Sequence, residues 1–192
     1  SQKALENESS SQADKLRGWI SEIENQVQRT DAIVQRLRRF SRRSDSRFSR
    51  ESIGDVIRST IKMLQFELKR EETLVELELD DAAAELELDR IQIEQVLVNL
   101  IRNACDAMRE LPPEQRLIRV TTQWLGDRVV VSVGDNGPGI DDAGKEQLFQ
   151  PFQTDKRDGL GLGLAISRSI IADHEGRIWA DNSVAGLTIQ FT

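Results

Sequence analysis

The chain has 192 residues, 38% of them hydrophobic and 31% charged, which suits one globular domain with an appendage. The sequence has no apolar run of about 18 residues and no signal-peptide pattern at its start, so we expect no direct membrane contact. The formal net charge of −7 disfavours nucleic-acid binding. The single cysteine, Cys105, allows no internal disulfide and favours a reducing, cytoplasmic setting.

Residues 1–46 are predicted to form a segment of their own. Apolar residues from Leu16 to Leu37 recur at alternating steps of four and three, as in a helix that packs along a partner helix. Because such a stripe needs cover, we expect a homodimer through this helix, with packing onto the chain's own globular part as the alternative. Residues 36–50 are strongly basic, which suits either a solvated helix end or a surface for an acidic partner.

The globular part, residues 47–192, shows both helical and strand periodicity. Apolar spacing predicts helices over 53–64, 89–108, 142–149 and 162–172. Alternation predicts strands at 74–79 and 85–88, a hairpin of 117–124 with 128–135, and closing strands at 177–181 and 187–192. These elements predict an α+β fold, a two-layer sandwich with helices on one face of a mixed sheet.

Two asparagines on the helix over 89–108 are the first candidate functional residues. Asn99 and Asn103 are four residues apart, which places them on one face of the helix. Asparagine is unfavourable inside a helix unless its side chain has a partner, and amide oxygens are suitable ligands for Mg²⁺. The pair therefore indicates a site for a metal ion and phosphate, with plain surface polarity as the alternative.

Two glycine-containing segments complete the pattern. Asp135-Asn-Gly137-Pro-Gly139 follows a strand directly, and its carboxylate is placed to accept a hydrogen bond from an exocyclic amine. Gly159, Gly161 and Gly163 run into the helix over 162–172, an arrangement typical of anion sites at helix N-termini. The second segment lacks the ending of a P-loop and the βαβ setting of a dinucleotide fold.

Together these segments resemble the catalytic domain of bacterial sensor histidine kinases, within the GHKL (Bergerat-fold) superfamily shared with gyrase, Hsp90-type chaperones and MutL. The resemblance covers residues 51–192 and has four motifs: the N box (Asn99, Asn103), the first glycine box (135–139), the F box (149–156) and the second glycine box (Gly159, Gly161, Gly163). Residues 29–43 also resemble the second helix of that family's dimerisation hairpin.

The resemblance implies a site for ATP and Mg²⁺. Asp135 is expected to recognise adenine, Asn99 and Asn103 to hold Mg²⁺ and phosphate, and Asn103 with Lys156 to serve catalysis. A mobile lid is expected over about 150–163. The full set of residues expected at the nucleotide is Asn99, Asn103, Asp106, Asp135, Gly137, Gly139, Ile140, Phe149, Thr154, Lys156, Gly159, Leu160, Gly161, Leu162, Gly163 and Leu164.

The resemblance also implies the reaction and the partners. The gyrase and chaperone branches typically have a glutamate where this chain has Asn99, and an amide cannot act as a base, so a kinase is favoured over an ATPase. The expected function is donation of the γ-phosphate to a histidine, for relay to the receiver domain of a response regulator. The only histidine, His174, matches a structural position, so we expect a fragment that does not phosphorylate itself. A GHKL ATPase, a serine kinase of the anti-sigma type and a nucleotide-binding pseudokinase remain as alternatives.

Overall fold

The computed structural model describes residues 47–80, 85–151, 161–183 and 186–192. The expected dimerisation helix, within 1–46, and most of the expected lid lie outside the described residues. In chain order, the described elements are β1 (Ser49–Ser52), α2 (Ile53–Arg70), β2 (Leu74–Glu78), β3 (Glu85–Leu88), α3 (Arg90–Ala107), the 3-10 turn Pro113–Gln115, β4 (Leu117–Leu125), β5 (Arg128–Asp135), α4 (Asp142–Gln147), α5 (Gly163–Asp173), β6 (Ile178–Ser183) and β7 (Gly186–Phe191).

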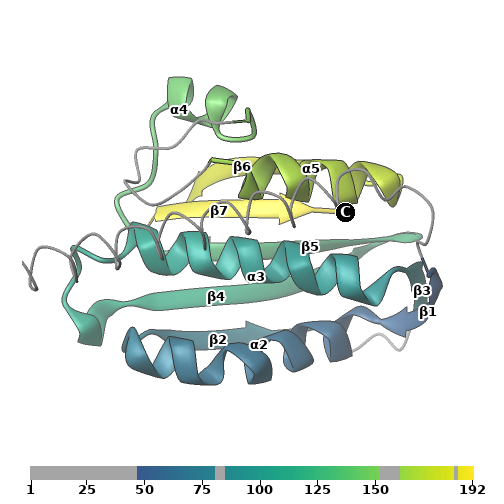
Figure 1. The fold of residues 1–192 in the computed structure, drawn as a ribbon, viewed down its shortest axis with the longest axis horizontal. Coiled ribbons are helices and arrows are strands. Elements are labelled where there is room, and N and C mark those ends of the chain that lie inside the picture. The colour runs from purple at the N-terminus through teal and green to yellow at the C-terminus, as the bar shows by residue number, and fades with distance from the viewer. Residues whose placement is uncertain (1–46, 81–84, 152–160, 184–185) are drawn as a thin grey trace, which may run out of the picture. The chain divides into compact units, whose positions relative to one another are not determined.

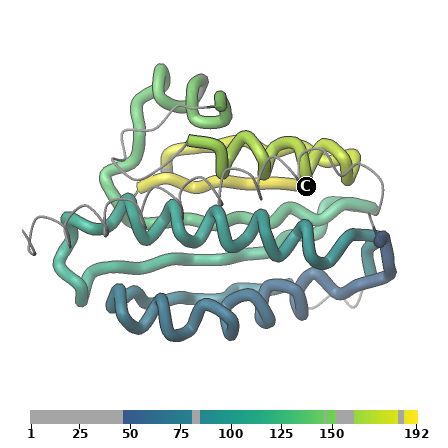
Figure 2. The backbone as a smooth tube through the Cα atoms, in the orientation of Figure 1, coloured from purple at the N-terminus to yellow at the C-terminus, as the bar shows by residue number. Residues whose placement is uncertain are grey.

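Five strands form one mixed sheet in the order β2-β4-β5-β7-β6. β2 runs parallel to β4, and the other neighbouring strands are antiparallel. Helices α2, α3 and α5 cover one face of this sheet (Figure 1), which confirms the expected two-layer α+β fold. α3 lies between α2 and α5 and packs against both (Figure 2).

Side-chain caps fix where the two longest helices begin. The Ser52 hydroxyl accepts a hydrogen bond from the backbone N–H of Asp55 at the start of α2. At the start of α3, the buried Asp89 carboxylate accepts one from the backbone N–H of Gln92. These caps satisfy first-turn donors that have no partner inside the helix, and each is worth roughly 1 kcal/mol.

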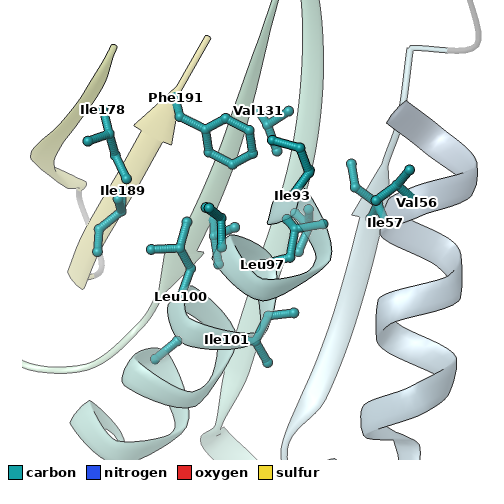
Figure 3. Close-up of a cluster of buried hydrophobic side chains, with 14 of the residues drawn as sticks. Val56, Ile57, Ile93, Leu97, Leu100, Ile101, Val131, Ile178, Ile189 and Phe191 are labelled. Carbon is teal, nitrogen blue, oxygen red and sulfur yellow. The ribbon is translucent and has the colours of Figure 1, made fainter. Parts of the chain in front are cut away.

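The hydrophobic core lies between the helices and the sheet. α3 supplies its centre, because the apolar face predicted from the three- and four-residue spacing is almost fully buried, from Ile93 through Leu97 to Ile101. Figure 3 shows these side chains meeting those of α2 and of strands β5, β6 and β7. α3 is therefore held on both sides, and the polar residues between its apolar positions are held with it.

The structure departs from the predicted elements at two places. β1 was not expected, because its residues are polar and show no alternation; pairing with β3 forms it, with Arg50 opposite Glu87. α2 extends to Arg70 instead of ending at residue 64, because its last turns bury Leu68 in the core and place Lys69 and Arg70 at the C-terminal end of the helix dipole.

Candidate nucleotide site

The two asparagines of α3 lie on its half-buried side, and Asn99 contacts the start of α5. The Asn99 side-chain nitrogen, Nδ2, donates to the backbone oxygen of Gly163 at 3.1 Å and to the Ser167 hydroxyl at 3.3 Å. Asn103 is also half-buried, one helical turn further along α3. The structure thus brings Asn99, the first of the predicted pair, to the helix that the second glycine segment begins.

Asp135, the last residue of β5, is buried with only 9% of its surface exposed. Its Oδ1 accepts hydrogen bonds from the backbone N–H of Gly137 at 2.8 Å and of Leu187 at 3.5 Å. Burial raises the pKa of this carboxyl above the ordinary range, and the two backbone donors counteract the shift in part. Among the described residues, Oδ2 accepts no hydrogen bond and remains available to a ligand's donor.

The backbone after Asp135 turns tightly and is fastened to the closing hairpin. Gly139 has a φ of 69°, which glycine adopts without strain. Ile140 donates its backbone N–H to the side chain of Asn182 on β6, and that side chain donates back to the carbonyl of Ile140 at 2.7 Å. On β7, a methyl group added at Gly186 would overlap the carbonyl of Asp135, so only glycine permits this close approach.

α5 begins without a side-chain cap. Leu162 occupies the N-cap position and makes no capping hydrogen bond. Within the described residues, the first-turn N–H groups therefore lack the side-chain acceptor that α2 and α3 have, and such a helix start favours an anion. Four residues that are expected to contact the nucleotide lie at this helix start. All four are half-buried: Gly161, Leu162, Gly163 and Leu164.

The remaining expected site residues are Asp106 and Phe149, which the structure describes, and four that lie outside the described residues. Asp106 follows Asn103 on α3 and pairs with Arg109 at 2.9 Å. Phe149, after α4, is buried in the core cluster. The positions Thr154, Lys156, Gly159 and Leu160 lie outside the described residues.

Sequence reasoning missed three contributors to this site: Ser167, Leu187 and Asn182. Ser167 and Asn182 contribute side chains, and Leu187 contributes its backbone N–H. The sequence motifs give none of the three a role. Each lies in a helix or strand whose periodicity already accounts for the residue as part of that element. Their roles depend on partners between 42 and 68 residues away in the sequence, which a local pattern does not contain.

His174 does not belong to this constellation. Its Nε2 accepts the backbone N–H of Asp89 at 3.0 Å, and its Nδ1 lies 2.8 Å from the carbonyl of Ile170, to which it donates. The ring also stacks in a tilted arrangement on Phe48, with centroids 4.8 Å apart. Nε2 thus joins the end of α5 to the start of α3, while Nδ1 caps the last turn of α5, which confirms the expected structural role.

The arrangement fits a nucleotide. A buried carboxylate with an available oxygen suits an exocyclic amine, as on adenine. The uncapped start of α5 suits phosphate, and the amide oxygens of α3 suit a hard cation held between phosphate and protein. These three features lie on β5, α5 and α3, which one hydrophobic core holds together.

Comparison with known proteins identifies the family. Residues 88–192 match the model of the "Histidine kinase-, DNA gyrase B-, and HSP90-like ATPase" family. The chain is 36% identical over 193 aligned residues to the sensor protein FixL of Bradyrhizobium diazoefficiens, covering all of this chain and 38% of FixL. It is 34% identical over 169 residues to the C4-dicarboxylate transport sensor protein DctB of Rhizobium meliloti, covering 88% of this chain and 27% of DctB.

Solved structures of a histidine kinase resemble this chain as well. The catalytic domain of histidine kinase ThkA superposes with a TM-score of 0.68 at 34% identity, covering 76% of this chain and 93% of that domain. ThkA crystallised in complex with the response regulator protein TrrA gives a TM-score of 0.75 at 32% identity, covering 92% of this chain and 50% of ThkA.

The chain therefore belongs to the family of histidine kinase-, gyrase- and HSP90-like ATPases, and its globular part is an ATP-binding domain. Within that family it is the catalytic domain of a sensor histidine kinase. It spans less than two fifths of the length of FixL and of DctB. In the described part of the chain, no helix has both the length and the apolar character needed to cross a membrane.

Proposed function

We propose that this domain binds ATP together with Mg²⁺ and donates the γ-phosphate to a histidine on a dimerisation hairpin, for relay to an aspartate of a response-regulator receiver domain. The observation that supports this most directly is the environment of Asp135. The fold buries a carboxylate, occupies one of its oxygens with backbone donors and leaves the other available. Burying a charge in this way costs stability unless a ligand uses it.

The other residues have proposed roles around the phosphates. Asn99 and Asn103 hold Mg²⁺ and phosphate oxygens, and the start of α5 binds the phosphate chain through its backbone N–H groups. Mg²⁺ neutralises charge that develops on the γ-phosphate during transfer. Lys156 adds a second positive charge against that phosphate, as the family resemblance implies.

The amide at position 99 favours transfer to a protein over hydrolysis. An amide does not accept a proton near neutral pH, so Asn99 does not activate water. Its nitrogen is also committed to Gly163 and Ser167, which holds the side chain in place as a ligand. Slow hydrolysis preserves the γ-phosphate for another acceptor.

Two partners are proposed for this chain, a receiver domain and a second copy of the chain itself. ThkA, a similar kinase, was crystallised with a response regulator. For this chain we propose a receiver domain as the final acceptor and a homodimer formed through residues 1–46. His174 is excluded as the first acceptor, because both of its ring nitrogens have partners within the fold.

Calorimetric titration of the Asp135→Asn variant tests the nucleotide site. The asparagine keeps an oxygen for the N–H groups of Gly137 and Leu187 but presents an NH₂ group to the adenine amine. A hydrogen bond to a charged group is worth about 1.5–3 kcal/mol, so affinity for Mg-ATP is expected to fall about ten- to a hundredfold. Asp127→Asn, at the exposed far end of the same hairpin, is the matched control. Equal affinity in both variants would remove Asp135 from the site.

Labelled ATP tests the transfer. The chain alone is expected to take up no acid-labile phosphate, because its only histidine is engaged in the fold. A separate polypeptide with an intact dimerisation hairpin is expected to become labelled on its histidine when the two are mixed. Asn103→Ala should abolish that labelling through loss of an amide ligand. Label on His174 in the chain alone would contradict the proposal.

A further inference from the structure

Ser167 is a buried polar residue to which the sequence motifs assign no role. It lies on α5, one turn after Gly163, and no part of it is exposed. Its hydroxyl is 3.0 Å from the carbonyl of Gly163 and 3.3 Å from Asn99 Nδ2, and Asn99 Nδ2 is 3.1 Å from the same carbonyl. Three polar groups therefore form a closed triangle between α3 and the first turn of α5.

The chemistry of the three groups fixes the direction of every hydrogen bond in the triangle. The carbonyl of Gly163 only accepts, so both the hydroxyl and the amide must donate to it. The hydroxyl has a single proton, which it gives to that carbonyl, so it must accept a hydrogen bond from the Asn99 amide. A reversed amide would place the Asn99 oxygen, Oδ1, against the carbonyl of Gly163, which has no proton to donate. The nitrogen of Asn99 is thus fixed toward α5, and Oδ1 is the atom left for a ligand.

Gly163 keeps that oxygen accessible. A Cβ atom added at Gly163 would lie 3.4 Å from Oδ1 of Asn99, in van der Waals contact with it. A longer side chain at this position would cover the oxygen. The amide oxygen and the uncapped helix start are therefore immediate neighbours, as a joint site for a cation and a phosphate requires.

We propose that Ser167 is a positioning residue for the Mg²⁺ site: its hydroxyl orients the Asn99 amide so that the oxygen serves the metal ion, and it ties that amide to the helix start that receives phosphate. This inference rests on the proposed role of Asn99 in binding Mg²⁺. It implies that Ser167 affects the contribution of Mg²⁺ to nucleotide affinity and leaves the recognition of the base at Asp135 unaffected.

The test compares ADP affinity with Mg²⁺ and with EDTA in the wild type and in Ser167→Ala. In the variant the amide loses one of two acceptors and is less strictly oriented. The ratio of the ADP affinity with Mg²⁺ to the ADP affinity with EDTA is expected to shrink about three- to tenfold, which corresponds to the loss of one neutral hydrogen bond. The affinity with EDTA should stay near the wild-type value. Ser169→Ala, on the same helix with no side-chain hydrogen bond among the described residues, is the matched control and should keep the wild-type ratio.

The outcomes separate this inference from the proposed function. If the wild type binds no nucleotide, or binds it equally with and without Mg²⁺, the proposed function fails first. If the wild type shows the Mg²⁺ effect and Ser167→Ala retains it in full, only the role of Ser167 is overturned. An equal loss of affinity in both conditions would likewise overturn it, since that result indicates general damage to the fold.

A spectroscopic readout does not depend on nucleotide at all. The side-chain NH₂ protons of Asn99 should exchange slowly with solvent in the empty wild-type protein, because the nitrogen donates to two acceptors within the fold. Ser167→Ala removes one acceptor and should speed this exchange, and Ser169→Ala should leave it unchanged. Should Ser167→Ala fail to fold, Ser167→Cys keeps the volume with a weaker donor and acceptor and should give an intermediate exchange rate. Unchanged exchange in the folded variant would contradict the triangle.

Discussion

At the scale of single residues, Asp135 combines a cost to the fold with a proposed use in binding. Burial raises its pKa, so the fold disfavours the charged form. A raised carboxyl pKa means that the native state holds its proton to a higher pH than the unfolded chain does. The Asp135 carboxyl therefore contributes fully to the stability of the fold when the pH is below the ordinary pKa of aspartate. That contribution is lost as the pH rises through the raised pKa of Asp135.

This linkage predicts a pH dependence of ATP affinity. Only the ionised carboxylate offers two acceptor oxygens, so binding should weaken as the pH falls through the raised pKa of Asp135, at a higher pH than an ordinary aspartate would require. Calorimetry from neutral pH down into the acid range should show the decline in the wild type, while Asp135→Asn should bind weakly with little slope. A parallel slope in the two proteins would assign the pH dependence to another group.

At the scale of elements, α3 links the core to the site. One face of this helix packs on the sheet through residues such as Leu97, and the neighbouring positions carry Asn99 and Asn103, the proposed ligands of Mg²⁺ and phosphate. The hydrogen bond between Asp89 and His174 joins the start of α3 to the end of α5. Packing that fixes the helix also fixes the spacing of its amides relative to α5.

The Leu97→Ala variant tests whether this face of α3 forms part of the core. Leu97 has no exposed surface, so removing its side chain should lower the free energy of unfolding by about 2–5 kcal/mol through lost burial and a cavity. Ile91→Ala on the same helix is the matched control: Ile91 is 75% exposed, and its effect should stay within about 0.5 kcal/mol. Urea unfolding of the three proteins measures both. Similar losses at the two positions would contradict the assigned core.

At the scale of the whole molecule, the proposed partner is a second copy of the chain, bound through residues 1–46. The apolar stripe between Leu16 and Leu37 has the spacing of helix–helix contact, and the globular domain has a core of its own. We expect a dimer that dissociates on dilution. Ile23→Asp should make it monomeric, because a charge would be buried in the contact.

Sedimentation at several concentrations measures this association. Asn25→Asp, at a polar position on the side of the predicted helix opposite the stripe, is the matched control and should leave the dimer intact. A wild-type chain that stays monomeric at high concentration would instead indicate that the helix covers its own domain.

The sequence by itself determined the fold class, most element boundaries and the four motifs. Helical spacing marked the core face of α3, alternation marked the hairpin of β4 and β5, and Asp135 was placed at the end of a strand, where the structure has it. These are local properties, because periodicity and turn chemistry depend on residues close together in the chain.

Only the tertiary structure decided what those residues contact. β1 exists because β3 pairs with it, since its own residues have no strand pattern. Asp135 has one oxygen engaged and one available because β7 supplies the N–H of Leu187 and the close approach at Gly186. Ser167 orients Asn99 across 68 residues of sequence. The contacts of Asp135 and Asn99 form when α5 and the closing strands pack beside α3 and β5, and the free energy of that packing is distributed over the whole core.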